Sequence, residues 1–193
     1  VAEALNLQET TSRLLEQLAF VVPHDSASVQ LLRGNELEII GGDGWANSAS
    51  VIGGRFPVPG HNPNTKVIET RQPVLIGDTY ETYPIFRTIQ HAAHIRSWLG
   101  VPLIVRDQLI GLLAIDSRQT NHFTQDHIQV VTAFASQVAV AVENARLFDE
   151  VQQLAITDGL TGLYNRRHFM ELAKSEFERA RRYKRHLSVM LFD

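Results

Sequence analysis

The sequence of 193 residues contains no cysteine. This absence excludes disulfide bonds, thiolate metal sites, cysteine nucleophiles and cofactors attached through a thioether, and it is compatible with a reducing cytoplasm. There is also no run of about 18 consecutive apolar residues, so we expect no membrane-spanning segment within the chain. The formal net charge of −3 gives no indication of a nucleic-acid partner.

The composition, with 44% hydrophobic residues, allows a substantial core. The length leaves room for one domain of about 150 residues and a remnant. Val1 falls within a helical pattern, and Asp193 ends an apolar run. We therefore expect both ends to be cut from a longer chain, and an upstream membrane anchor stays an open alternative to a purely cytoplasmic protein.

A long helix is predicted over residues 124–156, and its apolar residues form two stripes with steps of three and four. The first stripe is typical of a helix packed on its own domain and contains Ile128, Val131, Ala135, Val138, Val142 and Ala145. The second lies about a third of a turn away and contains Val130, Ala133, Gln137, Val140, Asn144, Leu147, Val151 and Leu154.

The second stripe continues beyond the first, which fits a coiled-coil seam with a second copy of the chain. The residues expected in this dimer seam are Val140, Asn144, Leu147, Val151 and Leu154. Asn144 in the seam would fix its register at a cost in stability; the alternative is a polar residue at a partly solvated domain edge. The predicted partner is therefore a second copy, in a homodimer.

The rest of the chain predicts an α+β fold, an antiparallel sheet flanked by helices. An amphipathic helix precedes Pro23, and alternation on both sides of Gly34-Asn35 predicts a hairpin. The strongest strands, over 98–105 and 109–116, are apolar on both faces and should lie centrally. Further expected elements are a strand near 55–58, a helix over about 64–70 capped by Asn62 or Asn64, a strand over 73–76 and a short helix over 88–95. The terminal helices are expected to form a bundle in the dimer.

The segment over residues 77–97 is long and aromatic, which is typical of a functional loop. We expect it to cover a small-molecule pocket, with unfilled core as the alternative. The candidate pocket residues are Trp45, Asp78, Tyr80, Phe86, His91 and Trp98, with Arg87 and Arg96 nearby. His91 and His94 have the spacing of a shared helix face, which suits metal or haem ligation, but two histidines with no third ligand in view more often make ordinary polar contacts.

Four segments in order resemble a GAF domain over roughly residues 5–151. They cover residues 73–79, 97–103, 109–117 and 123–126, the last leading into a helix rich in Ala and Val. The resemblance implies a sensory domain over residues 1–150. Covalent bilin attachment, which some members of the family use, requires a cysteine and is excluded here.

A second resemblance covers residues 154–167, which are similar to the entry motif of GGDEF domains, the diguanylate cyclases. All eight fixed positions of the pattern Asp-x-Leu-Thr-Gly-Leu-x-Asn-Arg-Arg are present. A predicted helix from residue 168 to about 182 and a strand over 187–193 follow. We therefore expect residues 151–157 to end the connector helix and residues 158–193 to begin an incomplete GGDEF domain.

The GGDEF resemblance implies that Asp193, at the end of that strand, ligates catalytic Mg²⁺. In that family the signature loop and the guanine-recognising residues follow this position, so the fragment is not expected to be an enzyme. Mg²⁺ and GTP belong to the intact parent, which would make cyclic di-GMP from two GTP. Asp158, Gly162, Asn165 and Arg166 are assigned to a structural turn.

The sequence thus predicts a cytoplasmic signal-transduction module, a GAF domain that senses a small molecule, dimerises and controls a diguanylate cyclase. The fragment itself is expected to hold no cofactor other than an unidentified effector. One alternative is a ligand-free dimerisation domain. Another is a parent whose degenerate GGDEF part acts as a cyclic di-GMP receptor or precedes a phosphodiesterase domain.

Overall fold

The structure of the protein, a computed structural model, describes residues 2–45, 51–88 and 92–190, without the side chains of residues 2–9, 149–150 and 152–154. The chain divides into two compact units, Val1–Ala145 and Arg146–Asp193. The first contains a sheet with helices, and the second contains a turn and a helix.

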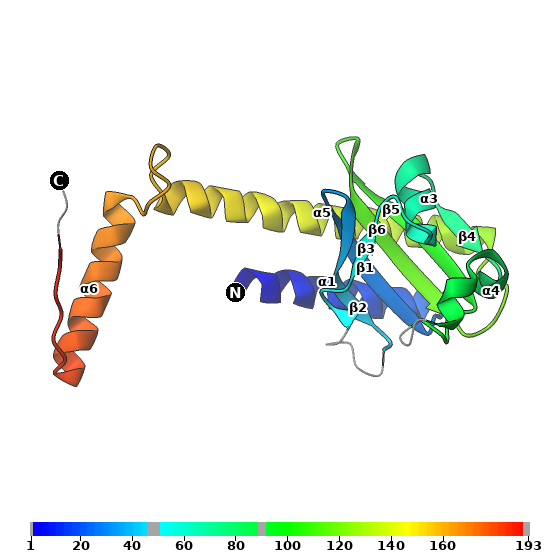
Figure 1. Cartoon of the computed structure of the whole chain (residues 1–193), viewed down its shortest axis with the longest axis horizontal. Helices are drawn as coiled ribbons and strands as arrows, with labels where there is room; N and C mark the ends of the chain where they lie inside the picture. Colours follow the sequence, from blue (N-terminus) through cyan, green and yellow to red (C-terminus); the bar gives the residue numbers. More distant parts are fainter. Residues whose placement is uncertain (1, 46–50, 89–91, 191–193) are drawn as a thin grey trace. The chain divides into compact units, whose positions relative to one another are not determined.

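The first unit is built on a six-stranded sheet in the order β3-β2-β1-β6-β5-β4 (Figure 1). The strands are β1 (Ser26–Arg33), β2 (Glu36–Asp43), β3 (Arg55–Pro57), β4 (Val74–Ile76), β5 (Ser97–Val105) and β6 (Gln108–Ser117). Every pair of neighbours is antiparallel. The hairpins β1–β2 and β5–β6 expected from the sequence are confirmed, and β1 pairs with β6 at the centre.

The two faces of the sheet carry different layers. Helices α1 (Ala2–Val21) and α5 (Gln125–Ile156) pack on one face, where their apolar residues join those of β1, β5 and β6 in the main core. The other face is covered by α3 (Pro63–Thr70), α4 (Thr79–Thr82) and the 3₁₀ helix η1 (Pro84–Arg87) around a smaller apolar cluster (Figure 1). The predicted α+β class is therefore confirmed.

Alternation along the central strands assigns each side chain to one face. In β1, Ala27, Val29 and Leu31 belong to the main core under α1 and α5. Ser28 and Gln30, between them, face the opposite layer and line a cavity there. The same strand therefore builds the core with one set of residues and a polar surface with the other.

Helix α5 is long and apolar enough over Gln125–Phe148 to cross a membrane by composition alone, with a mean hydropathy of 1.2. Its Val131, Ala135 and Val138 are instead buried in the main core. The core helix of a globular domain has the same composition, so this property alone does not assign α5 to a membrane.

The prediction of a helix over residues 88–95 is wrong within the described part of the chain, where residues 92–94 form a turn. The helical residues lie earlier, in α4 and η1. The Asp78 carboxylate caps α4 by accepting the Tyr80 N–H at 2.9 Å, and Pro84 begins η1. Asp is favoured as an N-cap and Pro at the first position of a helix, so these two residues set where α4 and η1 begin.

In the second unit, the expected helix is confirmed as α6 (Arg166–Tyr183), but residues 187–190 form no strand. All residues of α6 are described, and none is buried. Val189 and Met190 are exposed. A strand needs a paired neighbour, and the described part of this unit supplies none. Asp193 lies outside the described residues.

We predict that Leu113→Ala lowers the free energy of unfolding by about 2–5 kcal/mol, because Leu113 is fully buried between the sheet and the helices. Urea unfolding followed by circular dichroism measures the change. Ile104→Ala in β5 is the matched control, because Ile104 is exposed and its loss should cost less than about 1 kcal/mol. Equal effects of the two substitutions would contradict this assignment of the core.

Candidate functional site

A cavity of about 430 Å³ lies on the face of the sheet opposite α1 and α5. Its floor is formed by side chains of β1, β2, β5 and β6, and its walls come from β3, the start of α3, η1 and the turn before β5. Its lining includes Ser28, Gln30, Trp45, Arg55, His61, Asn64, Phe86, Ala92, Ile95, Trp98 and Asp116.

Two tryptophans of the cavity wall lie against glycines. A Cβ atom at Gly100 would come within 2.0 Å of the Trp98 ring, and one at Gly42 would come within 2.3 Å of the Trp45 ring. The Trp98 indole therefore occupies the space that a side chain at Gly100 of β5 would need, and the Trp45 indole occupies that of a side chain at Gly42 of β2. The flat apolar walls of the cavity depend on these close approaches.

A chain of hydrogen bonds crosses the cavity floor from α3 to β1. Asn64 Nδ2 donates to Gln30 Oε1 at 3.1 Å, and Gln30 Nε2 donates to Ser28 Oγ at 3.0 Å. All three side chains are buried. Buried amides are stable only when they are hydrogen-bonded, so this chain holds polar groups in an otherwise apolar site.

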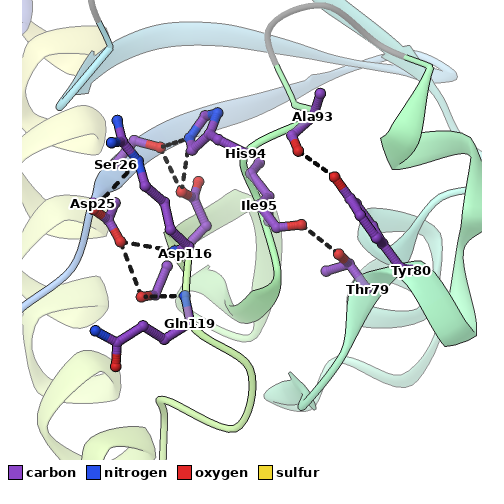
Figure 2. A network of polar contacts seen from close by, with 11 residues as sticks. Asp25, Ser26, Thr79, Tyr80, Ala93, His94, Ile95, Asp116 and Gln119 are labelled. Atoms are coloured by element: carbon purple, nitrogen blue, oxygen red, sulfur yellow. Dashed lines mark hydrogen bonds and ion pairs between the residues drawn. The ribbon is translucent and has the colours of Figure 1, made fainter.

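Asp116 is the buried acid of the cavity and has an exposed fraction of 4%. The Ser26 hydroxyl donates to its Oδ1 at 2.5 Å, and His94 Nε2 lies 3.4 Å from the same oxygen and 3.2 Å from Ser26 Oγ (Figure 2). Burial raises the pKa of the Asp116 carboxyl, and the contacts with His94 and Ser26 oppose this only in part. This geometry differs from a nucleophilic triad. In a triad the serine hydroxyl donates to the histidine, whereas here the Ser26 hydroxyl donates to the Asp116 carboxylate.

The turn that carries His94 is held from its other side by α4. The Tyr80 hydroxyl donates to Ala93 O, and the Thr79 hydroxyl donates to Ile95 O at 2.5 Å. Figure 2 shows these two carbonyls directed toward α4 while the His94 ring points to Ser26 and Asp116. The turn, whose Ala92 and Ile95 line the cavity, is thus fixed between α4 and the sheet.

Asp78 reinforces this arrangement through Arg96, which follows the turn. Arg96 Nη2 donates to Asp78 Oδ2 at 2.7 Å, and the guanidinium holds the pKa of Asp78 below its ordinary value. Arg96 and Arg87 also lie over the Tyr80 ring, 4.6 and 4.9 Å from its centroid. Asp78 and Tyr80 therefore hold the turn that forms part of the cavity wall, although neither side chain lines the cavity.

A second acid, Asp25, fixes the chain where β6 ends. Its Oδ2 accepts the Ser117 hydroxyl at 3.0 Å and the Arg118 N–H at 2.8 Å. Burial alone would raise the pKa of Asp25, but these bonds from Arg118 and Ser117 bring it below its ordinary value. His122 Nε2 lies 2.8 Å from Pro23 O, so the segment entering α5 is tied to the segment leaving α1.

The structure places some of the predicted pocket residues in the cavity and not others. Trp45, Phe86 and Trp98 line it. Asp78 and Tyr80 lie outside the lining, and His91 lies outside the described residues. His94 contacts Ser26 and Asp116, and among the residues that the structure describes no group of three or more His, Asp or Glu side chains is placed to hold a metal ion.

The polar floor was not predicted, because the predicted pocket residues are all aromatic or ionisable, whereas Ser28, Gln30 and Asn64 are neutral polar residues. Ser28 and Gln30 alternate with apolar residues in a strand that is buried on both faces. Polar residues at such positions need partners, so this pattern could have indicated the floor. Asp116 at the end of an apolar strand was a similar indication.

The structure describes four of the five predicted seam side chains along α5. Val140 and Val151 are exposed by 53% and 62%, Asn144 is exposed and Leu147 is half-buried. The side chain of Leu154 lies outside the described residues. The seam itself stays a prediction.

The turn after α5 is held by its own residues. The Asp158 carboxylate accepts the Thr161 N–H at 3.0 Å and the Leu160 N–H at 3.2 Å, and its bonds with Thr161 lower its pKa. Gly162 has a φ of 70°, which suits glycine. Asp158 therefore closes the turn through its side chain, and Gly162 supplies the positive φ.

Asn165 joins this turn to both helices. Its Oδ1 accepts the His168 N–H at 3.0 Å as the N-cap of α6, and its Nδ2 donates to Ala155 O in the last turn of α5 at 2.7 Å. Arg167 donates to the same carbonyl at 3.2 Å, whereas Arg166 is exposed. Arg167 therefore contacts the last turn of α5, a contact that the sequence motif did not indicate.

The fold and these motifs agree with the comparison against protein families. Residues 6–142 match the family described as the GAF domain. The chain belongs to the GAF family. Residues 155–193 match part of the family described as the diguanylate cyclase, GGDEF domain. Both resemblances expected from the sequence are therefore confirmed, the second as the start of a domain.

Individual relatives are more distant. The chain is 26% identical over 157 residues to the anaerobic nitric oxide reductase transcription regulator NorR of Vibrio vulnificus, a match over 79% of the chain and 30% of the regulator. The GAF domain/HD domain protein of Geobacter sulfurreducens is similar in structure, with a TM-score of 0.62, 17% identity, and coverage of 75% of this chain and 96% of that one.

The GAF-B domain of DevS from Mycobacterium smegmatis is also similar, with a TM-score of 0.57, 19% identity, and coverage of 78% of this chain and 98% of that one. At these identities the likeness shows the fold alone. The chain spans about 30% of the length of the curated regulator that it matches.

The raised pKa of Asp116 predicts a pH-dependent stability. The folded protein holds this proton more tightly than the unfolded chain, so the associated stability is complete below the ordinary value of about 3.9 and is lost as the pH rises through the folded pKa. Asp116→Asn cannot ionise, and we expect its free energy of unfolding to increase relative to the natural chain as the pH rises above about 4.

Urea unfolding at a series of pH values measures this difference. Asp107→Asn in the β5–β6 turn is the control, because Asp107 is exposed and both residues accept its positive φ of 65°. A difference that stays constant with pH, or falls as the pH rises, would contradict the burial of an unneutralised carboxylate at Asp116.

Proposed function

We propose that this chain is the sensory and dimerising part of a bacterial cytoplasmic signalling protein in which a GAF domain controls a diguanylate cyclase. The parent would condense two GTP into cyclic di-GMP, with Mg²⁺ ligated in part by Asp193. The other catalytic residues would follow Asp193 in the parent. An unidentified small molecule in the cavity is the proposed input.

The observation that carries the proposal is the continuity of α5. The first half of this helix packs on the cavity-bearing sheet, and its last turn is bonded by Asn165 and Arg167 of the GGDEF motif. The helix is uninterrupted over Gln125–Ile156. A change in how α5 is held in the GAF domain would therefore reach the GGDEF motif along one continuous helix.

The cavity also has a short route to the start of α5. Asp116 lines the cavity. The next residue, Ser117, ends β6, and its hydroxyl donates to the Asp25 carboxylate. The segment after Arg118 leads directly into α5, and His122 ties it to Pro23. A ligand that shifts Asp116 would thus act on both terminal helices, provided that it binds two arrangements of them unequally.

Dimerisation supplies the output in this proposal. Each active site of the cyclase family is expected to hold one GTP, so two catalytic domains must meet. The exposed apolar residues Val140 and Val151, with half-buried Leu147 between them, support α5 as the pairing element. NorR, with which the chain shares 26% identity over 157 residues, is named a transcription regulator, which supports a role in regulation but not a particular effector.

We predict a dimer whose dissociation constant rises by roughly tenfold or more in Val151→Glu, because a charge in an apolar seam must be desolvated. Analytical ultracentrifugation measures the constant. Ile104→Glu is the control, since Ile104 is an exposed apolar residue of β5 away from the seam. A chain that is monomeric at high concentration, or is equally affected by both substitutions, would contradict the seam.

In the parent protein, we expect Mg²⁺-dependent conversion of GTP to cyclic di-GMP, abolished by Asp193→Asn and reduced by roughly tenfold or more in Val151→Glu as dimerisation weakens. Chromatography of the reaction products measures both effects. Binding of cyclic di-GMP without GTP turnover would contradict the proposed cyclase and favour a receptor. A catalytically active dimer that responds to no effector would favour the alternative of a ligand-free dimerisation domain.

A further inference from the structure

The polar groups of the cavity floor differ in the charge that they present. Asp116 lines the cavity with an exposed fraction of 4%, and its contacts with Ser26 and His94 are both made by Oδ1. Its second carboxylate oxygen takes part in neither contact. The carbonyl oxygen of Asn64 is likewise not used in the hydrogen-bond chain across the floor. The floor therefore offers oxygen acceptors.

Basic groups lie elsewhere in the lining. Arg55 is the only arginine or lysine among the described lining residues, and its guanidinium lies 3.3 Å from Glu36 and 3.8 Å from Glu38. His61 lies against the Tyr83 ring with the centroids 5.6 Å apart. The basic group nearest to Asp116 among its described contacts is therefore His94, at 3.4 Å from Oδ1, and Arg55, the arginine of the described lining, is paired with Glu36 and Glu38 instead.

We propose that the cavity binds a small molecule with a flat apolar body and a cationic or N–H-donating nitrogen directed at Asp116. This inference rests on the proposed sensory function, because it names the chemical class of the effector. The nitrogen would donate to Asp116, and the body would lie among Trp45, Phe86 and Trp98.

The energetics favour a cation over an anion at this position. A carboxylate inside a protein loses its hydration, and a partner of opposite charge that donates hydrogen bonds compensates for that loss. Burial raises the pKa of Asp116, and the contacts with His94 and Ser26 offset this only in part. A ligand carboxylate or phosphate at this position would face a like charge or would require Asp116 to hold a proton.

The size of the cavity agrees with such a ligand. A volume of about 430 Å³ lies in the lower part of the range of roughly 300–1,000 Å³ found for small-molecule sites. The tryptophan walls suit a planar ring system, since offset stacking and edge contacts stabilise aromatic pairs. A bicyclic aromatic body therefore makes a suitable probe.

The test uses three probes with one body and different charges: 2-naphthamidine, 2-naphthamide and 2-naphthoate. We expect the amidine to bind the full chain at least about tenfold more tightly than the naphthoate in isothermal titration calorimetry, a difference of about 1.4 kcal/mol. The neutral amide, which retains N–H donors, should lie between them.

Two variants locate the interaction. Asp116→Asn should reduce the preference for the amidine over the naphthoate to less than about threefold, whereas Asp107→Asn on the exposed turn should preserve it. Ala92→Phe, which places a ring in the cavity, should abolish binding of all three probes. Circular dichroism establishes that each variant is folded, and the preference in the natural chain tests the inference even if Asp116→Asn unfolds.

The outcomes separate this inference from the proposed function. Equal or tighter binding of the naphthoate, binding of no probe, or an unchanged preference in Asp116→Asn would each overturn the assignment to Asp116. None of these results affects the dimer or the GTP turnover, which test the proposed function. A monomeric chain that still prefers the amidine would overturn the proposed signalling route and leave the ligand class standing.

Discussion

The pairing of β1 with β6 at the centre of the sheet is the constraint on which both the core and the cavity depend. Its register places Ser26 opposite Asp116 and Val29 opposite Leu113. The first pair contributes to the cavity side and the second to the core under α1 and α5. A slip of one residue would exchange the faces of a strand, so the buried acid and the apolar core specify the register together.

The polar part of the cavity illustrates how a buried site is stabilised by what surrounds it. Asp116 is compensated by Ser26 and His94, and the turn carrying His94 is fixed in turn by the hydroxyls of Thr79 and Tyr80. Isolated buried polar groups are costly, whereas connected networks are rigid. The rigidity of the cavity wall therefore originates outside the lining, in side chains that face away from the cavity.

The sequence predicted the regular elements well where their patterns were long. The long helix predicted over residues 124–156, the Gly34-Asn35 hairpin and the GGDEF motif all correspond to the structure or the family comparison. The helix predicted over residues 88–95 was wrong in its described part, because the helical residues lie earlier, in α4 capped by Asp78 and in η1 beginning at Pro84. The motif did not indicate that Arg167 donates to Ala155 O, because this contact depends on the geometry of the turn.

The sequence by itself determined the GAF identity, the α+β class and the long connecting helix, because these follow from residue order and from periodicities that local geometry imposes. It also determined the absence of cysteine chemistry. Only the tertiary structure decided that Ser28, Gln30, Asn64 and Asp116 line one cavity. It also decided that Asp78 and Tyr80 lie outside the lining and hold the turn that borders it. These residues come from separate strands and helices, and no local pattern encodes which of them share a face across a folded sheet.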